Sequence, residues 1–473
     1  MDPIRYLTNS DVAQNRPVHA VWELTLACDL KCCHCGSRAG RKRREELSTV
    51  EAIGLVGQLA ELGVREVTLI GGEAYLRKDW AQIISAVVKA GMLCSLQTGG
   101  RSLNEARVGE AVAAGLGAVG VSIDGLCELH DRLRGVRGSF EAAFAALRRF
   151  QARGVATSVT TQITREVIPQ LPELCELLIA AKVRNWQVQL TVAMGRAADN
   201  EHLLVQPYQM LELMPLLSEL FQKGARSGLV LQPGNNIGYF GPYEGLLRGS
   251  GNEMVHYQGC FAGRNVLGIE ADGTVKGCPS LATDTFSSGN IKDKPLKEIW
   301  QYSPTMSFAR GLTRADLWGF CASCYYADVC KGGCTWTSHS LLGRAGNNPY
   351  CHHRALELAK DGRRERVVKV ASAPGRSFDL ARFEVVMEAK DERSIEGPCR
   401  PDDPQNRCAA PAAGSPERHL VVCRGCKRHV FSGTIECPFC GGTLRALADD
   451  YAQKLEIATH AKLRLQAAIQ SID

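Results

Sequence analysis

Short apolar runs alternate with longer segments of helical periodicity over roughly the first two hundred residues of the chain. The runs have the length of buried strands, which we expect at residues 18–26, 66–70, 93–97, 118–123, 156–163 and 186–192. The segments between them carry apolar residues at helical spacing, which predicts helices over residues 48–62, 80–90, 103–114, 140–152 and 168–181. This regular alternation indicates a parallel sheet, either doubly wound or closed into a full or partial barrel.

The ends of these helices carry start and stop signals. Ser48 and Glu51 have the spacing of a capping box at a helix N-terminus. Glycines stand where four of the helices should end, at positions 63, 91, 115 and 154. In either sheet geometry the chemistry falls in the loops after the C-terminal ends of the strands, so we expect the functional residues there.

Composition narrows the class of protein. The chain has 473 residues, enough for two or three domains, and its 45% apolar and 22% charged residues are ordinary for a globular protein. This excludes a mainly disordered chain and a collagenous one. The net charge of +6 does not suggest a nucleic-acid partner. The N-terminus lacks the apolar segment of a signal peptide, and no apolar run approaches the roughly 18 residues of a membrane span, so no membrane contact is expected.

Cysteine is the outlier in the composition, with 20 residues that cluster near the start, in the centre and near the end of the chain. Without a secretion signal, this number predicts metal ligands in a reducing compartment, by default the cytoplasm, rather than a disulfide framework. Cysteines outside the metal sets are expected to be buried small hydrophobes or free thiols, namely Cys33, Cys94, Cys127, Cys175, Cys399 and Cys408.

The first cysteine group directly follows the first predicted strand. Its spacing is Cys28-x3-Cys32-x2-Cys35, and three thiolates can hold three irons of a [4Fe–4S] cube while the fourth iron stays open to another ligand. An iron with an open position is reactive rather than structural. The alternative is a structural zinc knuckle with His34 as its fourth ligand.

This motif resembles that of the radical SAM superfamily, whose cluster binds S-adenosylmethionine at the open iron. The resemblance implies that Cys28, Cys32 and Cys35 hold the catalytic cluster. It extends to the motifs after the following strands, which are then expected to bind S-adenosylmethionine: Gly71, Gly72 and Glu73 at the methionine amino group, Thr98 at the end of the third strand, Ser122 at the ribose, Asp124 and Arg134 close by, and Gly195 and Arg196 near the adenine. A Gly-Gly turn allows close backbone approach to a ligand, and a carboxylate suits an ammonium group.

The central cysteine group is similar to the SPASM extension, which carries two auxiliary iron–sulfur clusters in radical SAM enzymes that modify peptides and proteins. The resemblance implies an outer cluster on Cys321, Cys324, Cys330 and Cys351 and an inner cluster on Cys260, Cys278 and Cys334. Relatives with two fully ligated clusters have one more cysteine shortly before the position of Cys260, and this chain has none there. His256 could supply the fourth inner ligand, the position could be open to a substrate thiolate, or the cluster could be smaller.

Two further points bear on the central group. Pro279 follows Cys278 at the position where sulfatase-maturing relatives carry an Asp associated with proton removal, which counts against that activity. CxxC spacing alone would also permit zinc knuckles, and the radical SAM pattern upstream makes this the minor interpretation.

Three segments are expected after the central group. They are a helix and Pro-rich linker over residues 359–418, a zinc ribbon over 419–445, and over 446–473 an amphipathic helix packed on a neighbour or a partner. Two CxxC pairs give the ribbon four thiolates that close a tetrahedral site, Cys423, Cys426, Cys437 and Cys440. Structural zinc is favoured there over a redox iron.

Together these expectations describe an α/β protein with a partial (β/α)6 barrel over residues 17–230, a SPASM domain over 231–358 and a zinc-ribbon-like C-terminal module. The resemblance implies a maturase that takes hydrogen from a ribosomally made peptide or protein and leaves a crosslink or an oxidative modification. It implies a reductant such as flavodoxin or ferredoxin. Because only about 17 residues precede the first strand, peptide recognition is expected to fall to the barrel mouth, the C-terminal ribbon or a separate peptide-recognition protein.

Two other functions compete with this one. The first is radical SAM modification of a small molecule such as a tetrapyrrole. The second is an iron–sulfur electron-transfer or scaffold protein without radical chemistry. The intact motifs at Gly71–Glu73 and Ser122 argue against the second, because a pure electron carrier needs no S-adenosylmethionine pocket.

Overall fold

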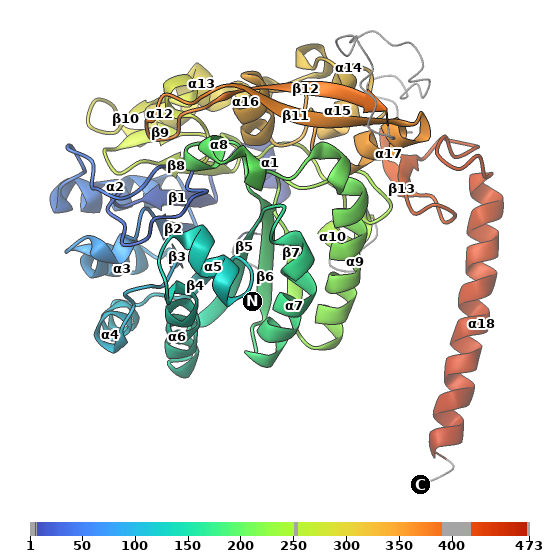
Figure 1. Cartoon of the computed structure of the whole chain (residues 1–473), viewed down its shortest axis with the longest axis horizontal. Coiled ribbons are helices and arrows are strands. Elements are labelled where there is room, and N and C mark those ends of the chain that lie inside the picture. Colours follow the sequence, from blue (N-terminus) through green and yellow to red (C-terminus); the bar gives the residue numbers. More distant parts are fainter. Residues whose placement is uncertain (1–4, 6, 250–253, 390–417, 471–473) are drawn as a thin grey trace.

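A ten-stranded sheet forms the body of the molecule (Figure 1), in a computed structural model that describes residues 5, 7–249, 254–389 and 418–470. Its strand order is β10-β9-β8-β1-β2-β3-β4-β5-β6-β7. The strands from β1 to β7 are parallel, and their bounds are β1 (His19–Glu23), β2 (Glu66–Ile70), β3 (Leu93–Thr98), β4 (Ala118–Ser122), β5 (Ala156–Ile163), β6 (Asn185–Leu190) and β7 (Val230–Pro233). Because sheet order follows chain order here, the sheet is not doubly wound, and the predicted partial barrel is confirmed.

Helices between these strands cover the outer face of the sheet, as Figure 1 shows. The larger ones are α2 (Thr49–Glu61), α3 (Trp80–Lys89), α4 (Glu105–Ala113), α6 (Ser139–Ala152), α7 (Leu171–Ala180) and α9 (Met210–Arg226), and shorter ones are α1 (Asn9–Ala13), α5 (Cys127–Arg134), α8 (Arg196–Asp199) and α10 (Glu244–Gly249). The predicted capping box of α2 is present, since the Ser48 hydroxyl accepts from the Glu51 N–H and the Glu51 carboxylate accepts from the Ser48 N–H at 2.7 Å.

The core lies between the sheet and these helices. Its largest fully buried side chains include Trp22, Trp80, Phe150 and Trp186. Removing a side chain of this size from water contributes about 2–3 kcal/mol. Cys94 and Cys175 are also fully buried in this core, which confirms their predicted role as small hydrophobes.

The cysteine-rich region continues the barrel sheet rather than forming a sheet of its own. Its strands are β8 (Val266–Ile269), β9 (Thr274–Lys276) and β10 (Gly289–Asn290), and β8 pairs in parallel with β1. The helices of the region are α11 (Thr283–Phe286), α12 (Leu296–Tyr302), α13 (Pro304–Gly311), α14 (Phe320–Ser323), α15 (Ala327–Cys330), α16 (Thr335–Leu342) and α17 (His352–Lys360). This shared sheet places the central cysteines beside the strand that precedes the first cysteine loop.

An antiparallel hairpin follows α17, made of β11 (Arg363–Ala371) and β12 (Arg382–Ala389). The sequence predicts a helix and linker over residues 359–418, and this prediction is wrong for residues 363–389. Val367, Phe383 and Met387 are buried, and valines that favour strands lie between the charged residues of the hairpin. The rest of this prediction, a linker that contains Cys399 and Cys408, falls on residues 390–417 and lies outside the described residues.

The C-terminal ribbon predicted over residues 419–445 contains β13 (Leu420–Val422) and β14 (His429–Phe431), and the long helix α18 (Leu444–Gln470) begins at its end. Figure 1 shows α18 projecting away from the rest of the molecule. Leu447 packs on the ribbon, whereas Leu455 is 56% exposed, so the predicted amphipathic helix contacts a neighbour in its first turns and is exposed over the rest of the part whose side chains are described. Within the described ranges, no helix combines the length and the apolar character needed to cross a membrane.

Candidate active site

A cavity of about 270 Å³ lies at the C-terminal ends of the parallel strands. Its wall contains nine of the predicted site residues, which are Cys28, Cys32, Cys35, Gly71, Gly72, Glu73, Thr98, Ser122 and Arg134. These residues come from the loops or ends of β1, β2, β3 and β4 and from α5, so the fold gathers motifs that lie far apart in the sequence, from Cys28 to Arg134. We call this cavity the barrel chamber.

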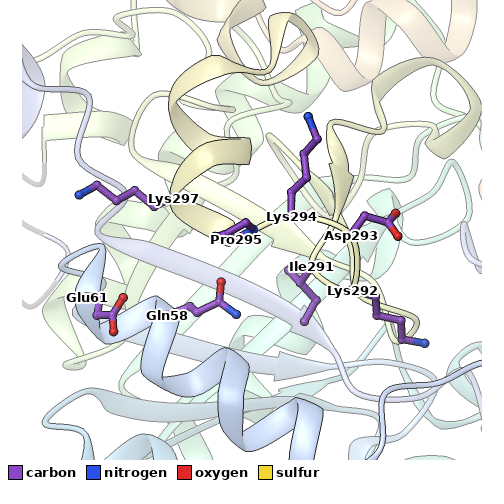
Figure 2. Close-up of a pocket in the computed structure, with 8 residues that line it drawn as sticks. All are labelled: Gln58, Glu61, Ile291, Lys292, Asp293, Lys294, Pro295 and Lys297. Atoms are coloured by element: carbon purple, nitrogen blue, oxygen red, sulfur yellow. The ribbon is translucent and has the colours of Figure 1, made fainter.

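A second cavity, of about 340 Å³, lies between α2 and the segment before α12 (Figure 2). Gln58, Glu61, Ile291, Lys292, Asp293, Lys294, Pro295 and Lys297 line it. Figure 2 shows its three lysine side chains pointing in different directions rather than converging on one point. This cavity holds none of the predicted site residues, so the barrel chamber is the candidate active site.

The loop of the first cysteine group is held by main-chain hydrogen bonds that leave its thiols facing the chamber. The Leu30 N–H donates to the sulfur of Cys28 and the Ala39 N–H to the sulfur of Cys35, both at 3.4 Å. Burial raises the pKa of the Cys28 thiol to about 12 and that of Cys32 to about 11. Three thiols converging on one chamber, with N–H groups directed at their sulfurs, fit the donor set of an iron–sulfur cluster.

Glu73 lies at the floor of the chamber and is 2% exposed. Its carboxylate accepts hydrogen bonds from the Thr98 hydroxyl at 2.5 Å and from the Gly99 N–H at 2.7 Å. Burial nevertheless raises the pKa of Glu73 to about 7. A bound ammonium group would favour the ionised carboxylate, so the site suits the amino group of an amino acid.

The two glycines before Glu73 have a packing role. A Cβ on Gly72 would lie 2.0 Å from the carbonyl oxygen of Ala27, and one on Gly71 would lie 2.3 Å from that of Thr25. The turn after β2 therefore lies so close to the backbone at the start of the cysteine loop that neither glycine position has room for a side chain. This close approach brings Glu73 and Cys28 to the same wall.

Asp124 is fully buried and does not line the chamber. One oxygen of its carboxylate lies 2.6 Å from a guanidinium nitrogen of Arg134 and 3.1 Å from a ring nitrogen of His34, and both of these residues do line the chamber. Burial alone would raise the pKa of Asp124, but Arg134 and His34 hold it well below its usual value. Arg134 also donates to the sulfur of Cys32 at 3.7 Å. Asp124 thus positions the cation beside the cysteine loop.

Gly195 and Arg196 also lie behind the wall of the chamber rather than on it. The Arg196 guanidinium donates to the carbonyl of Cys32 at 2.7 Å, and its N–H donates to the carbonyl of Cys35 at 2.9 Å. A Cβ on Gly195 would lie 2.3 Å from the carbonyl oxygen of Gly36. The turn after β6 therefore holds the cysteine loop in place.

Several polar chamber residues were not expected from the sequence. They are Gln97, Thr160, Gln162, Gln189 and Thr191, together with Trp336 from α16. The signal was present in β6, where polar residues alternate with buried apolar ones, and in β5, where Thr160 and Gln162 share one face of the strand. A filled barrel interior would carry branched apolar residues at such positions, so this alternation indicates a cavity for a polar ligand.

The central cysteines form two groups in the structure. Cys321, Cys324, Cys330 and Cys351 are buried and line one cavity, which we call the outer cavity. Four thiols around one cavity fit a fully ligated iron–sulfur cluster.

Cys260, Cys278 and Cys334 form the other group. Burial, together with the neighbouring Cys260 and Cys278 thiols, raises the pKa of the Cys334 thiol to about 12. Trp336 lies two residues after Cys334 and reaches the barrel chamber, so this inner group lies on the chamber side. The ring of His256 instead packs against Phe240 at 5.8 Å and His429 at 5.4 Å, beside the outer cavity and the ribbon.

The four ribbon cysteines come together as one compact set. The sulfurs of Cys423 and Cys440 lie 3.8 Å apart, those of Cys426 and Cys437 lie 3.6 Å apart, and all four lie within 4.8 Å of one another. A tetrahedral zinc with Zn–S bonds of about 2.3 Å separates its sulfurs by about 3.8 Å. This geometry fits the predicted structural zinc.

The tip of the β11–β12 hairpin reaches back to the cysteine loop. Asp379 accepts from Arg38 at 2.8 Å, its carbonyl accepts from the Gly195 N–H at 2.9 Å, and the Phe378 N–H donates to Gly36. The Phe378 ring lies 4.0 Å from the ammonium of Lys276, two residues before Cys278. The tip therefore contacts both the cysteine loop and the inner cysteine region.

We expect Asp379→Ala to weaken S-adenosylmethionine binding without removing a ligand. Arg38 would lose a buried carboxylate partner, at a cost of about 2–3 kcal/mol in stability. Calorimetric titration with S-adenosylmethionine should show a raised dissociation constant at unchanged iron content. Asp361→Ala is the matched control because Asp361 pairs with Arg363 at the exposed start of the hairpin. Equal affinities in the two variants would contradict this role of the tip.

Family comparisons agree with this geometry. The fold and the cysteine sites define an iron–sulfur enzyme built on a partial barrel. The chain matches the family described as the radical SAM superfamily over residues 22–178 and an iron–sulfur cluster-binding domain, SPASM, over residues 260–325. The chain belongs to the radical SAM superfamily and carries a SPASM domain.

Several characterised relatives are similar over most of their length. Mycofactocin maturase MftC of Mycobacterium ulcerans is 30% identical over 67% of this chain and 83% of its own. Fe-coproporphyrin III synthase of Methanosarcina barkeri is 28% identical over 72% of this chain and 89% of its own. The crystal structure of Streptococcus suis SuiB bound to S-adenosylmethionine matches with a TM-score of 0.57 at 20% identity, over 71% of this chain and 76% of that one, which supports the fold.

Proposed function

We propose that this radical SAM enzyme is a maturase that removes a hydrogen atom from a ribosomally made peptide or protein and so produces a crosslink or an oxidative modification. Its domains would be the barrel (17–230), the SPASM domain (231–358) and the ribbon (419–445). The observation that carries the peptide assignment is the polar but almost uncharged wall of the barrel chamber.

That wall offers amides and hydroxyls to a substrate. Gln97, Gln162, Gln189 and the nearby threonines can donate to and accept from peptide groups. Among the described lining residues Arg134 is the only Lys or Arg, and it is already paired with Asp124. A tetrapyrrole with several carboxylates would call for several cations, whereas a peptide backbone calls for the groups present.

The chain's own residues would position the cofactors. Cys28, Cys32 and Cys35 would ligate a [4Fe–4S] cluster, and Glu73, with Thr98 and the glycines before it, would bind the amino group of S-adenosylmethionine. Ser122 would meet the ribose, while Arg134, Asp124, Gly195 and Arg196 would hold the cluster loop. A cluster held there and reduced by one electron would, with bound S-adenosylmethionine, supply methionine and a 5′-deoxyadenosyl radical able to take a hydrogen atom from the substrate.

The central cysteines would hold two auxiliary clusters, the outer one on four cysteines and the inner one on Cys260, Cys278 and Cys334. With three cysteine ligands, the inner cluster would have a position for a substrate group next to the chamber. A flavodoxin or ferredoxin would supply electrons, a separate protein could present the peptide, and the ribbon would hold zinc. Reconstituted protein should then contain about twelve Fe and about one Zn.

The test is substrate retention by the anaerobically reconstituted protein. We expect the protein to retain one of the small peptides encoded beside its gene and to form 5′-deoxyadenosine faster in its presence. Gln162→Ala together with Gln189→Ala should weaken retention about tenfold or more, since two half-buried hydrogen-bond partners that line the chamber are removed. Retention of Fe-coproporphyrin instead of every peptide would contradict the proposal.

The second candidate is a tetrapyrrole-modifying enzyme. It is favoured by the similarity to Fe-coproporphyrin III synthase of Methanosarcina barkeri and to AdoMet-dependent heme synthase of Oleidesulfovibrio alaskensis, which is 28% identical over 86% of its length. The same retention assay distinguishes the two substrate classes.

A further inference from the structure

The C-terminal ribbon packs against the wall of the outer cavity. Three residues that line this cavity also contact ribbon side chains, namely Phe240, Tyr326 and His353. The ring of His429 lies 6.4 Å from that of Phe240, and the ring of Phe439 lies 6.0 Å from Tyr326 and 5.7 Å from His353. The ribbon therefore forms an additional layer over this wall.

Strand β14 adds hydrogen bonds to the loop that carries Cys324. The Tyr326 phenol donates to the carbonyl of His429 at 2.6 Å, and the Tyr325 phenol accepts from the N–H of Phe431 at 2.9 Å. Both tyrosines directly follow Cys324, and both β14 residues are buried. The strand is thus fixed against a segment that begins at an outer cysteine.

The buried cation Arg428 is a further contact between the ribbon and the wall of the outer cavity. The Arg428 guanidinium donates to Glu357 at 2.7 Å, meets the ring of His353, and lies 3.6 Å from the centre of the Phe439 ring. Arg428 is buried, so moving the ribbon away would separate this charge from its carboxylate. Leaving the buried Arg428 charge without this partly exposed carboxylate is costly, which holds the folded ribbon on this surface.

The ribbon has little besides its cysteine site to stabilise its own fold. Strands β13 and β14 have three residues each, and the buried core between them is Cys423, Val430 and Cys437. A two-stranded hairpin is marginally stable in water, whereas a metal held by four thiolates supplies folding free energy. The contact with the outer cavity is therefore expected to depend on metal in the ribbon.

We propose that the ribbon is a metal-dependent cover for the outer auxiliary cluster. With its metal bound, the ribbon keeps water, oxygen and chelators from the cluster; without it, the wall formed by Phe240, Tyr326 and His353 loses its outer layer. This inference rests on the proposed function, because it takes Cys321, Cys324, Cys330 and Cys351 as cluster ligands.

The test follows iron release from the reconstituted full chain to bathophenanthroline disulfonate, with zinc content and the electron paramagnetic resonance signals of the clusters measured in parallel. Cys440→Ser removes a ribbon ligand, and Phe439→Ala keeps all four thiols but removes the ring from the wall. We expect both variants to lose the outer cluster at least about tenfold faster than the wild type, because attack follows local opening of the cover. The signal of the cluster on Cys28, Cys32 and Cys35 should persist.

Leu455→Ala, on the exposed part of α18, is the matched control and should release iron at the wild-type rate. Equal release rates in the wild type, Phe439→Ala and zinc-free Cys440→Ser would overturn the inference. Failure of the proposed function can be told apart from failure of this inference. In that case the wild type itself would lack outer-cluster iron or would not cleave S-adenosylmethionine, whatever the ribbon variants show.

Discussion

Replacing Cys32 with Ala is expected to reduce formation of 5′-deoxyadenosine by more than about 100-fold. Removing a residue that only supports a metal ligand costs up to about 100-fold, and removing a ligand itself should cost more. Cys32 is the most buried of the three thiols and is the one that Arg134 contacts. Two remaining thiolates would hold the cluster poorly, and the open iron would lose its fixed place near Glu73. The measurement is product formation with dithionite as reductant, alongside iron content.

Cys33→Ala supplies the matched control for this variant. Cys33 is adjacent in sequence, but it packs half-buried against the core and its N–H donates to the carbonyl of Leu133. The substitution should leave both iron content and product formation near wild-type values. A loss in Cys33→Ala as large as that in Cys32→Ala would contradict the assignment of the three ligands.

Asp124→Ala is expected to lower the free energy of unfolding by about 3–5 kcal/mol, the usual cost of leaving one member of a buried ion pair alone. The Arg134 guanidinium would remain buried beside Cys32 without its carboxylate, and His34 would lose the same partner. Urea unfolding of the metal-free protein measures this loss apart from cofactor binding.

The pH dependence of this loss has a definite sign. The pKa of Asp124 is held well below its usual value, so its carboxylate stabilises the folded state fully above about pH 4, the ordinary pKa of an Asp. The stabilisation is lost as the pH falls further. Arg132→Ala removes a largely exposed pair with Glu166 and should cost less than about 1 kcal/mol. Equal losses in the two variants would contradict the role of Asp124.

Local pattern was sufficient to predict the barrel and the cysteine ligand candidates. The β5 strand occupies its predicted bounds, and Cys28, Cys32 and Cys35 face the cavity at the expected sheet edge. Sequence spacing alone could not show that Asp124 lies behind the wall of the barrel chamber rather than on it. Its position depends on Arg134 and His34, which lie in other elements.

Contacts between distant segments were beyond the reach of the sequence. Arg38 meets Asp379 across 341 positions, and Tyr326 meets His429 across 103. No periodicity within either segment specifies such a partner. The hairpin was also missed because its many charged residues resemble a solvated helix, while its valines pack in a two-stranded sheet. The ribbon's ligands were predictable from two CxxC pairs, but its place over the outer cavity was not.

The central claim is that hydrogen leaves a carbon of a peptide bound in the barrel chamber. It is tested most directly by incubating the reconstituted enzyme with S-adenosylmethionine, dithionite and deuterated versions of the peptides encoded beside the gene, and then measuring the mass of 5′-deoxyadenosine. The account predicts that deuterium from one of these peptides appears in 5′-deoxyadenosine. Deuterium delivered only from labelled Fe-coproporphyrin, with none from any peptide, would contradict it.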